Sequence, residues 1–192
     1  MAANSLVLAS GSKYRKTLLK RLGVPFKVWA PEVDENPLAG ELPRNTAVRL
    51  ARVKAEAGGR QFTTSWIIGS DQVADLDGVP LGKSGHRDAA IAQLESMSNR
   101  AVVFRTAVSV RRGDVAHDAL DATRVRFRPL SRAEIERYVD AEQPFDCAGS
   151  FKSEALGIAL FDAIETHDPT ALIGLPMIAT ARLLRTAGFL LP

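Results

Sequence analysis

A chain of 192 residues is long enough to bury a sizeable core, and we expect one domain over residues 1–192. Hydrophobic residues make up 46% of the chain and charged residues 24%, which excludes disordered and fibrous proteins. A net charge of +3 without a long basic run favours a small polyanionic partner over a nucleic acid.

The amino-terminal segment does not resemble a targeting signal. Met1 to Leu8 lack the charged start and the extended apolar run of a signal peptide, and no stretch has the length that crosses a bilayer. Cys147 is the single cysteine, so an internal disulfide is impossible, which agrees with a reducing compartment. We therefore expect a cytoplasmic protein without a membrane or nucleic-acid partner.

The first part of the chain alternates between predicted strands and helices. Ser5–Ala9 form a short apolar run typical of a strand, and Ser10–Ser12 supply a turn and a helix cap before a helix over Lys13–Leu22. Phe26–Ala30 predict a second strand. Residues Pro31–Pro43 then form an acidic, proline-containing loop, and loops of this length are often functional.

A second helix and a buried strand follow this loop. Asn45 is expected to cap the helix, and Gly58 with Gly59 are expected to end it. Trp66–Gly69 form an apolar run that predicts a buried strand. Asp71 is expected just past the end of that strand.

The middle of the chain is rich in predicted strands. Asp77-Gly78 is typical of a hairpin turn, and Ser84 is expected to cap the helix that follows. Ala101–Val110 and Ala122–Phe127 are β-prone runs that we expect to pair as antiparallel strands joined through Gly113-Asp114.

The last part of the chain returns to helices. Ser131 and Glu134 predict a capping box and a helix, Ile158–Ile164 predict a strand, and Pro176 suits the start of a final helix. Elements that alternate at first and then become strand-rich predict an α/β fold with a mixed sheet. A cleft between two lobes is the natural place for a site.

One turn has the chemistry of a phosphate-binding cradle. Ser10 and Ser12 offer hydroxyl groups at the positive end of a helix, and Lys13, Arg15 and Lys16 follow on that helix. On these residues alone, an ordinary capped helix with a solvated basic face explains the same pattern better.

Several other catalytic patterns are excluded. Gly78–Ser84 resemble a P-loop, but three residues separate the glycines where the motif has four. His86, His117 and His167 lie far apart and lack the spacing of zinc ligands. Cys147 has no motif partner, and a small buried hydrophobic role suits it best. Without a G-x-S-x-G elbow, carboxylates and a hard metal ion are the remaining catalytic resources.

Six segments together resemble the Maf-like nucleotide pyrophosphatases, in the same order and at similar spacing. The segments are Leu8–Ser12 with Arg15, Pro31–Glu35, Ala51–Lys54, Ile68–Val73, Gly82-Lys83 and Cys147–Glu154. The resemblance implies an elongated α/β fold like that of the inosine triphosphatases, with a mixed twisted sheet, flanking helices and two lobes around a central nucleotide cleft. It also implies hydrolysis of a nucleoside triphosphate to a monophosphate and pyrophosphate, with a divalent cation, Mg or Mn.

The resemblance also implies roles for individual residues. Asp71 becomes the proton acceptor that activates water for attack on the α-phosphate. A carboxyl group with an ordinary pKa of about 3.9 is a poor base at neutral pH, so Asp71 must have a raised pKa or act partly by holding the metal. Glu32 and Glu35 are further metal candidates, of which motif position favours Glu35. The residues implied for phosphate binding are Ser10, Ser12, Arg15, Lys54 and Lys83.

Base selection is implied for Tyr14, Gln72 and Glu154, and this stretch resembles the branch that acts on 7-methylguanosine triphosphate. A carboxylate at Glu154 can accept hydrogen bonds from both N–H groups of guanine, and a cationic purine stacks well on an aromatic ring such as Tyr14. A core position is the alternative for Tyr14. Three positions depart from the family pattern and bear on substrate choice: Ser84, Ala107 and Ala155.

Two other functions stay open at this point. One is the thymidine and uridine triphosphate pyrophosphatase branch of the same family. The other is a nucleotide-binding regulator of cell division in which catalysis is incidental. Relatives in the family are often homodimers, so a homodimer is a further expectation from the resemblance.

Overall fold

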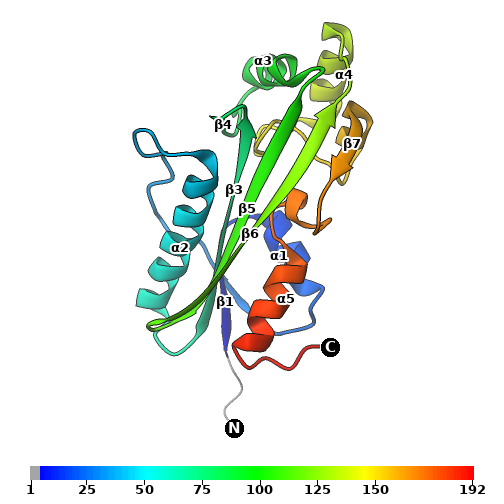
Figure 1. Ribbon diagram of the computed structural model, residues 1–192. Helices are drawn as coiled ribbons and strands as arrows, with labels where there is room; N and C mark the ends of the chain where they lie inside the picture. Colours follow the sequence, from blue (N-terminus) through cyan, green and yellow to red (C-terminus); the bar gives the residue numbers. More distant parts are fainter. Residues whose placement is uncertain (1–4) are drawn as a thin grey trace.

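A mixed, twisted sheet runs through the length of the molecule in the computed structural model, which describes residues 5–192 (Figure 1). In this part of the chain the sheet has seven strands, in the order β2-β1-β3-β5-β6-β7, with β4 also paired to β3. The strands are β1 (Leu6–Ala9), β2 (Lys27–Trp29), β3 (Trp66–Leu76), β4 (Val79–Leu81), β5 (Ala101–Arg112), β6 (Val115–Phe127) and β7 (Phe161–Glu165).

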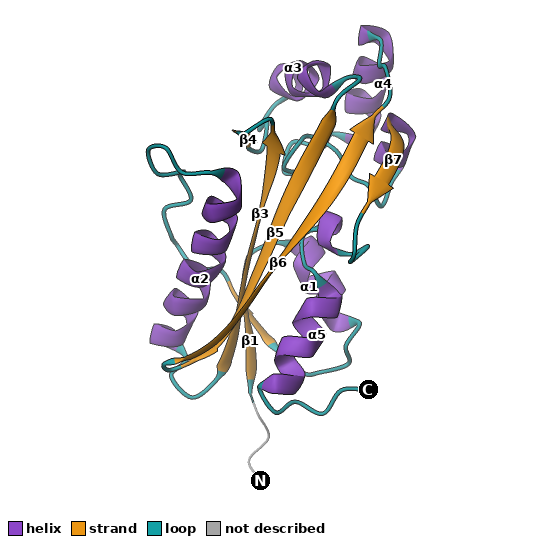
Figure 2. Cartoon of the chain, viewed as in Figure 1, coloured by secondary structure: helices purple, strands orange, loops and turns teal. Residues whose placement is uncertain are grey.

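Helices cover both faces of this sheet (Figure 2). Helix α2 lies on one side, α1 and α5 lie on the other, and α3 and α4 lie together at the far end of β5 and β6. The helices are α1 (Lys13–Lys20), α2 (Pro43–Gln61), α3 (Arg87–Met97), α4 (Arg132–Glu142) and α5 (Met177–Thr186), with short 3-10 helices η1 (Leu156–Leu160) and η2 (Ala171–Ile173). The predicted α/β fold with a mixed sheet and flanking helices is confirmed.

Strand β1 is apolar at every position because both of its faces are covered. Leu6 and Leu8 pack with residues of α1 and α5, whereas Val7 and Ala9 pack with Ala55 of α2. A second large cluster fills the other end of the molecule, between β5, β6, α3 and α4. These two clusters form the cores of the two expected lobes.

The sheet changes from parallel to antiparallel at β3. Strand β1 pairs in parallel with β2 and β3, and β3, β5, β6 and β7 pair antiparallel. On its β1 edge, β3 pairs with β1 up to Gly69 and with β4 only from Ala74 onward. Within the described residues, the segment of β3 from residue 70 to residue 73 thus faces a gap in the sheet on this edge.

Helix α2 differs from its predicted bounds at both ends. It begins at Pro43, so Asn45 lies inside its first turn and does not cap it. It also continues through Gly58 and ends at Gln61. Gly58 does not end the helix, because its missing side chain lets α2 pack closely on β3. A Cβ atom at Gly58 would lie 2.6 Å from Cγ2 of Ile67.

A still closer approach occurs at Gly69 of β3. A Cβ atom at this position would lie 2.1 Å from the carbonyl oxygen of Ala51 and 2.5 Å from the backbone nitrogen of Ala55. Only glycine fits such a contact, so the backbone of α2 lies directly against the backbone of β3.

Three other predicted boundaries are wrong. Asp71 lies inside β3 and not past its end, since β3 continues to Leu76. Ser84 does not cap α3, because His86 takes that position and its Nδ1 accepts a hydrogen bond from the backbone of Ala89. The expected strand over 158–164 begins only at Phe161, after η1.

Several local predictions are confirmed. Asp77 and Gly78 both have positive φ angles, of 52° and 86°, as a tight hairpin turn between β3 and β4 requires. Strands β5 and β6 pair antiparallel from Ala101↔Arg126 to Arg112↔Val115, although β6 begins at Val115 and not at the predicted Ala122. Ser131 and Glu134 form the capping box of α4. Among residues 5–192, no helix combines the length and the apolar character needed to cross a membrane.

Candidate active site

A cavity of about 850 Å³ opens where β3 faces the gap in the sheet. Its walls come from the turn before α1, the acidic loop, α2, β3, the segment after β4, the loop after α4, and residues 171–174, which we call the η2 segment. Ten of the predicted site residues line the cavity: Ser10, Ser12, Tyr14, Arg15, Glu35, Lys54, Asp71, Gln72, Lys83 and Glu154. Glu32 is exposed and is not among the lining residues.

The alternation of β3 distributes its side chains between the two faces of the sheet. Asp71 points to the α2 side, where it meets Lys54. Ser70 and Gln72 point to the opposite side, where they donate hydrogen bonds to carbonyl oxygens of the η2 segment. Because the neighbouring strand ends at Ala9, the cavity can include residues from both faces.

Lys54 lies between two carboxylates. Its Nζ is 2.7 Å from Oδ1 of Asp71 and 2.9 Å from Oε1 of Glu35. The side chains of Lys54 and Asp71 are only 6% and 9% exposed, whereas that of Glu35 is 53% exposed. Asp71 is therefore buried at the base of the cavity and is held in place by the ammonium group, with Glu35 nearer to solvent.

Both acidic and basic side chains line the cavity, and three of the basic ones act on Glu35. Burial alone would raise the pKa of Glu35, but the hydrogen bond and charge of Lys54, together with the charges of Lys83 and Arg15, hold that pKa below its ordinary value. An anion entering the cavity therefore meets three cationic side chains.

Arg15 is fixed by the backbone around it. Its Nε donates to the carbonyl oxygen of Gly174 at 2.7 Å, and its Nη1 donates to Oγ of Ser10 at 3.3 Å. Burial lowers the pKa of Arg15, while the charges of Asp71 and Glu35 act in the opposite direction. An arginine stays protonated in this setting, so it presents a positioned positive charge to the cavity.

The turn before α1 has the predicted capping geometry. Oγ of Ser12 accepts a hydrogen bond from the backbone nitrogen of Arg15, and Oγ of Ser10 accepts one from the backbone nitrogen of Ser12. Both serines line the cavity at the positive end of α1. The arrangement suits an anion, which is what the family resemblance implies for these serines.

The residues predicted to select the base, Tyr14, Gln72 and Glu154, also line the cavity. The amide nitrogen of Gln72 donates to Thr106 and to two η2 carbonyl oxygens, so it is already engaged by the protein. Burial raises the pKa of Tyr14, whose ring lies 5.0 Å from Nζ of Lys13. Glu154 is exposed at the cavity wall.

Cys147 differs from the buried hydrophobic role predicted for it. The side chain is only partly buried and lines the cavity, with Sγ 3.7 Å from the hydroxyl oxygen of Tyr14. Burial, with the nearby charge of Asp146, raises the pKa of Cys147 to about 11, although the Tyr14 hydroxyl acts against this shift. The thiol is therefore protonated at neutral pH.

Two carboxylates beside Lys54, those of Asp71 and Glu35, offer oxygen atoms that could coordinate a metal ion. Among the described residues, no group of three or more His, Cys, Asp or Glu side chains is placed to hold a metal ion. Mg²⁺ is commonly held by one or two carboxylates together with substrate phosphates. This donor set fits a hard divalent ion shared between the protein and a triphosphate.

The acidic loop that carries Glu35 is fastened to α2 through Glu41. The carboxylate of Glu41 accepts hydrogen bonds from Nε and Nη2 of Arg49, both at 2.7 Å, and from the backbone of Leu38 and the hydroxyl of Thr46. The bonds from Arg49 contribute most, and against a smaller opposing effect of burial they lower the pKa of Glu41 to about 2.

Glu41→Gln is expected to destabilise the protein in a pH-dependent way. The folded-state pKa of about 2 lies below the ordinary 4.5, so the stabilisation is complete above pH 4.5 and is lost as pH falls toward 2. Urea unfolding of both proteins between pH 7 and pH 3 should show a difference in midpoint that shrinks with falling pH. A difference that stays constant would exclude this role.

Comparison with known proteins places this geometry in a family. The sequence model for the family described as "Maf-like protein" matches residues 5–187. The chain belongs to the Maf-like protein family. The resemblance identified from the six sequence segments is thereby confirmed.

The chain is also similar to Maf-like relatives over nearly its whole length. It is 59% identical over 187 residues to a "7-methyl-GTP pyrophosphatase" of Xanthomonas oryzae pv. oryzae, covering 97% of this chain and 98% of the relative. A Xanthomonas campestris pv. campestris protein of the same name is 58% identical over 188 residues, covering 97% and 98%. One from a Polaromonas species is 55% identical over 185 residues, covering 95% and 84%.

Sequence reasoning missed the η2 segment as a part of this Maf-like site. Carbonyl oxygens of Ala171, Leu172 and Gly174 accept hydrogen bonds from Arg15, Ser70, Gln72 and Thr106. Backbone acceptors leave no signature in side-chain patterns. Asp168 is the residue in the sequence that indicates an ordered turn here, because aspartate often accepts hydrogen bonds from backbone N–H groups. Its Oδ2 accepts one from the backbone nitrogen of Ile178 at the start of α5.

Proposed function

We propose that this Maf-like protein hydrolyses a nucleoside triphosphate, 7-methylguanosine triphosphate above all, to the monophosphate and pyrophosphate. The observation that carries the proposal is the buried carboxylate of Asp71 inside a cavity lined by Arg15, Lys54 and Lys83. Relatives that are 55–59% identical over nearly the whole chain carry the name 7-methyl-GTP pyrophosphatase, which supports the same substrate here.

The cationic side chains bind and orient the triphosphate. Arg15 and the start of α1 lie beside Ser10 and Ser12, and Lys83, on the segment after β4, lines the same cavity. Phosphoryl and nucleotidyl transfer depends mainly on positioning and on neutralising negative charge. These groups therefore hold the chain of phosphates and stabilise the charge that develops on the leaving pyrophosphate.

Asp71 acts on the attacking water. Its carboxylate accepts a proton as the water oxygen bonds to the α-phosphorus and as the bond from that phosphorus to the bridging oxygen breaks. Lys54 keeps the carboxylate in one orientation through its 2.7 Å contact. A divalent ion, Mg or Mn, held by Asp71, Glu35 and the phosphates would neutralise charge on the reacting phosphate. The nucleotides of the cytoplasm are the substrates that we propose.

Glu154 selects the base. Its carboxylate, on the cavity wall, accepts hydrogen bonds from the N1–H and N2–H₂ groups of a guanine, and the ring of Tyr14 stacks on the methylated, cationic purine. The ring of Tyr14 already has a cation, Lys13, near it. A pyrimidine offers no such pair of donors.

Glu154→Gln is expected to weaken guanine-type substrates selectively. One acceptor becomes a donor that faces N–H groups, so kcat/KM for 7-methylguanosine triphosphate should fall about tenfold. The value for uridine triphosphate, measured on the same preparation, should change less than twofold by the same reasoning. An equal loss for both nucleotides would remove Glu154 from base selection.

Pyrophosphate release across a panel of nucleotides tests the proposed function. The proposal expects 7-methylguanosine triphosphate to give the highest kcat/KM, with hydrolysis stopped when a chelator removes the divalent ion. Fastest release from thymidine or uridine triphosphate would assign the chain to the other branch. Nucleotide binding with poor turnover, even at high enzyme and magnesium, would favour a regulator of cell division.

A further inference from the structure

Two loops form one wall of the cavity and meet each other. Residues 82–85, after β4, carry Lys83, and residues 144–152, after α4, lead to Glu154. Lys83 and Ala148 form an isolated antiparallel bridge, and the backbone nitrogen of Gly85 donates to the carbonyl oxygen of Phe145 at 3.1 Å. The loop that carries a phosphate-binding residue is thus joined to the loop that leads to the base-selecting residue.

Gln93 of α3 contacts both loops with one amide group. Its Nε2 donates to the carbonyl oxygen of Gly82 at 3.1 Å, and its Oε1 accepts from Oγ of Ser150 at 2.5 Å. Gln93 itself does not line the cavity. Its contacts therefore act on the backbone of the loops and not on a ligand.

The contact with Ser150 holds an unfavourable backbone conformation. Ser150 has a φ angle of 55°, in the left-handed region that few residues other than glycine adopt, and it is fully buried. The hydrogen bond to Gln93 satisfies its hydroxyl group and offsets part of this cost. The loop conformation around residue 150 depends on a partner outside the loop.

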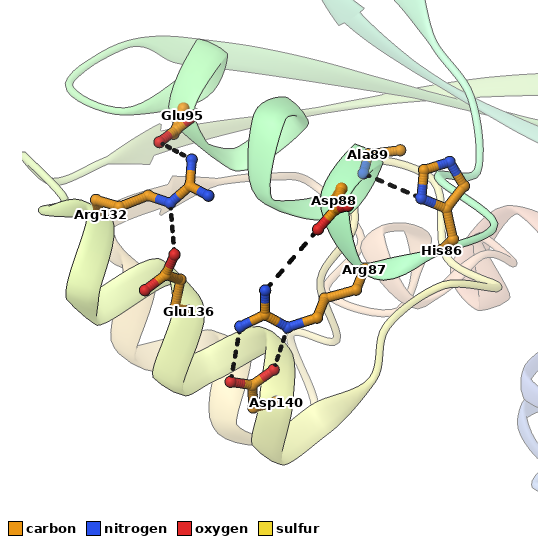
Figure 3. Close-up of polar contacts among 8 residues, drawn as sticks. All are labelled: His86, Arg87, Asp88, Ala89, Glu95, Arg132, Glu136 and Asp140. Carbon is orange, nitrogen blue, oxygen red and sulfur yellow. Dashed lines mark hydrogen bonds and ion pairs between the residues drawn. The ribbon is translucent and has the colours of Figure 1, made fainter.

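Helix α3 is a firm support for Gln93. Four of its residues are buried in the core, and this packing fixes the helix. Ion pairs to α4 (Figure 3) are exposed and add little: Nε of Arg87 is 2.6 Å from Oδ1 of Asp140, and Nη1 of Arg132 is 2.9 Å from Oε1 of Glu95. Helix α4 also holds the second loop, because the hydroxyl of Tyr138 accepts a hydrogen bond from the backbone of Lys152.

We propose that Gln93 is a positioning residue that fixes the two loops relative to each other. It sets where Lys83 meets the phosphates and where Glu154 meets the base, so a single amide couples recognition of the two ends of the nucleotide. This inference rests on the proposed function for its effect on catalysis. The tie between the loops can be measured without it.

Gln93→Ala is the test variant, and Glu95→Gln is its matched control on the same helix. Gln93→Ala should lower kcat/KM for the nucleotide about tenfold, equivalent to about 1.4 kcal/mol, mainly through a higher KM. Glu95→Gln removes the ion pair to Arg132 on the other side of α3 and should leave both constants unchanged. Unchanged kinetic constants in Gln93→Ala, with an active wild-type enzyme, would overturn the proposal.

A double-mutant cycle separates positioning from a general loss of structure. In a Lys83→Ala background, Gln93→Ala should cost clearly less than tenfold, because part of its effect passes through Lys83. Fully additive losses would overturn the proposal. Ser150→Gly gives a second variant that should fold well, since glycine adopts the positive φ angle while the hydroxyl contact is lost. Ser150→Gly should raise KM less than Gln93→Ala does, because the contact of Gln93 with Gly82 is kept.

Hydrogen exchange tests the tie independently of catalysis. Backbone amides in residues 82–85 and 145–152 should exchange faster in Gln93→Ala than in wild type or Glu95→Gln, while α3 keeps its protection. Unaltered exchange in both loops would show that Gln93 does not hold them. An inactive wild-type protein with the expected exchange would contradict the proposed function alone.

Discussion

Replacing Asp71 with asparagine is expected to lower pyrophosphate release by about a thousandfold. Asparagine has the same shape and can still contact Lys54, but it cannot accept the proton of the attacking water or bind a metal ion as a carboxylate does. Single-turnover measurements at saturating nucleotide report this loss directly. Circular dichroism should match that of wild type, and the urea midpoint should fall less than in a variant without Lys54, because Glu35 still pairs with Lys54.

Asp75→Asn is a matched control for this variant. Asp75 lies on the same strand, four residues further along, where its carboxylate contacts Arg105 at 3.3 Å outside the cavity. It should retain full turnover. Turnover near the wild-type level in Asp71→Asn would take the proton-accepting role away from Asp71.

Lys54→Met is expected to give the second-largest effect, on turnover and on stability together. The substitution keeps the length of the side chain but leaves Asp71 and Glu35 without their shared cation. We expect turnover to fall about a hundredfold, because the orientation of Asp71 and a phosphate contact are both lost. The free energy of unfolding should fall by about 2 kcal/mol, less than for a fully buried pair because Glu35 is half exposed.

Arg52→Met provides the comparison for Lys54. Arg52 lies two residues earlier on α2 and pairs with Asp118 at 2.7 Å on the surface. Breaking such a pair should change the free energy of unfolding by less than about 1 kcal/mol and should not change turnover. Similar losses in the two variants, measured by urea unfolding and pyrophosphate release, would show that the position of Lys54 between the carboxylates has no special importance.

Local patterns predicted much of the fold because their physical causes are local. The capping box at Ser131 and Glu134 and the hairpin turn at Asp77-Gly78 both depend on a few neighbouring residues, and both are present. The continuous apolar run of β1 is likewise explained by the helices that cover both of its faces. The order of elements was sufficient to predict a mixed sheet.

The predicted bounds failed where pairing or packing with distant residues decides the structure. The apolar run stops at Gly69, so the sequence pattern predicts Asp71 past the end of the strand. Strand β3 continues because its other edge pairs with β5 from Ile67↔Arg111 to Asp75↔Val103. Its polar residues there face the cavity and the η2 segment, so hydrophobicity no longer marks the strand. A glycine pair likewise does not end α2, since Gly58 lets the helix pack on Ile67.

The candidate site also has a part that the sequence predicts and a part that depends on contacts between distant segments. The site residues named from the family resemblance line one cavity, with the exception of Glu32. Gln93 and the carbonyl oxygens of η2 could not be found in this way, because each acts through contacts between segments far apart in the sequence. An amide on the surface of a helix has the same appearance in a sequence whether it faces water or joins two loops.

The contact at Gly69 has a consequence for how this protein can vary. Lys54 belongs to α2 and Asp71 to β3, and the backbones of these two elements are in direct contact at Gly69, which has no side chain. The distance between α2 and β3 beside this pair is therefore set by backbone contact and not by the size of side chains. Substitutions that repack the apolar residues on either side can accumulate without moving this pair apart. The geometry of the Lys54–Asp71 pair is thus independent of sequence changes in the surrounding core, as long as residue 69 is glycine.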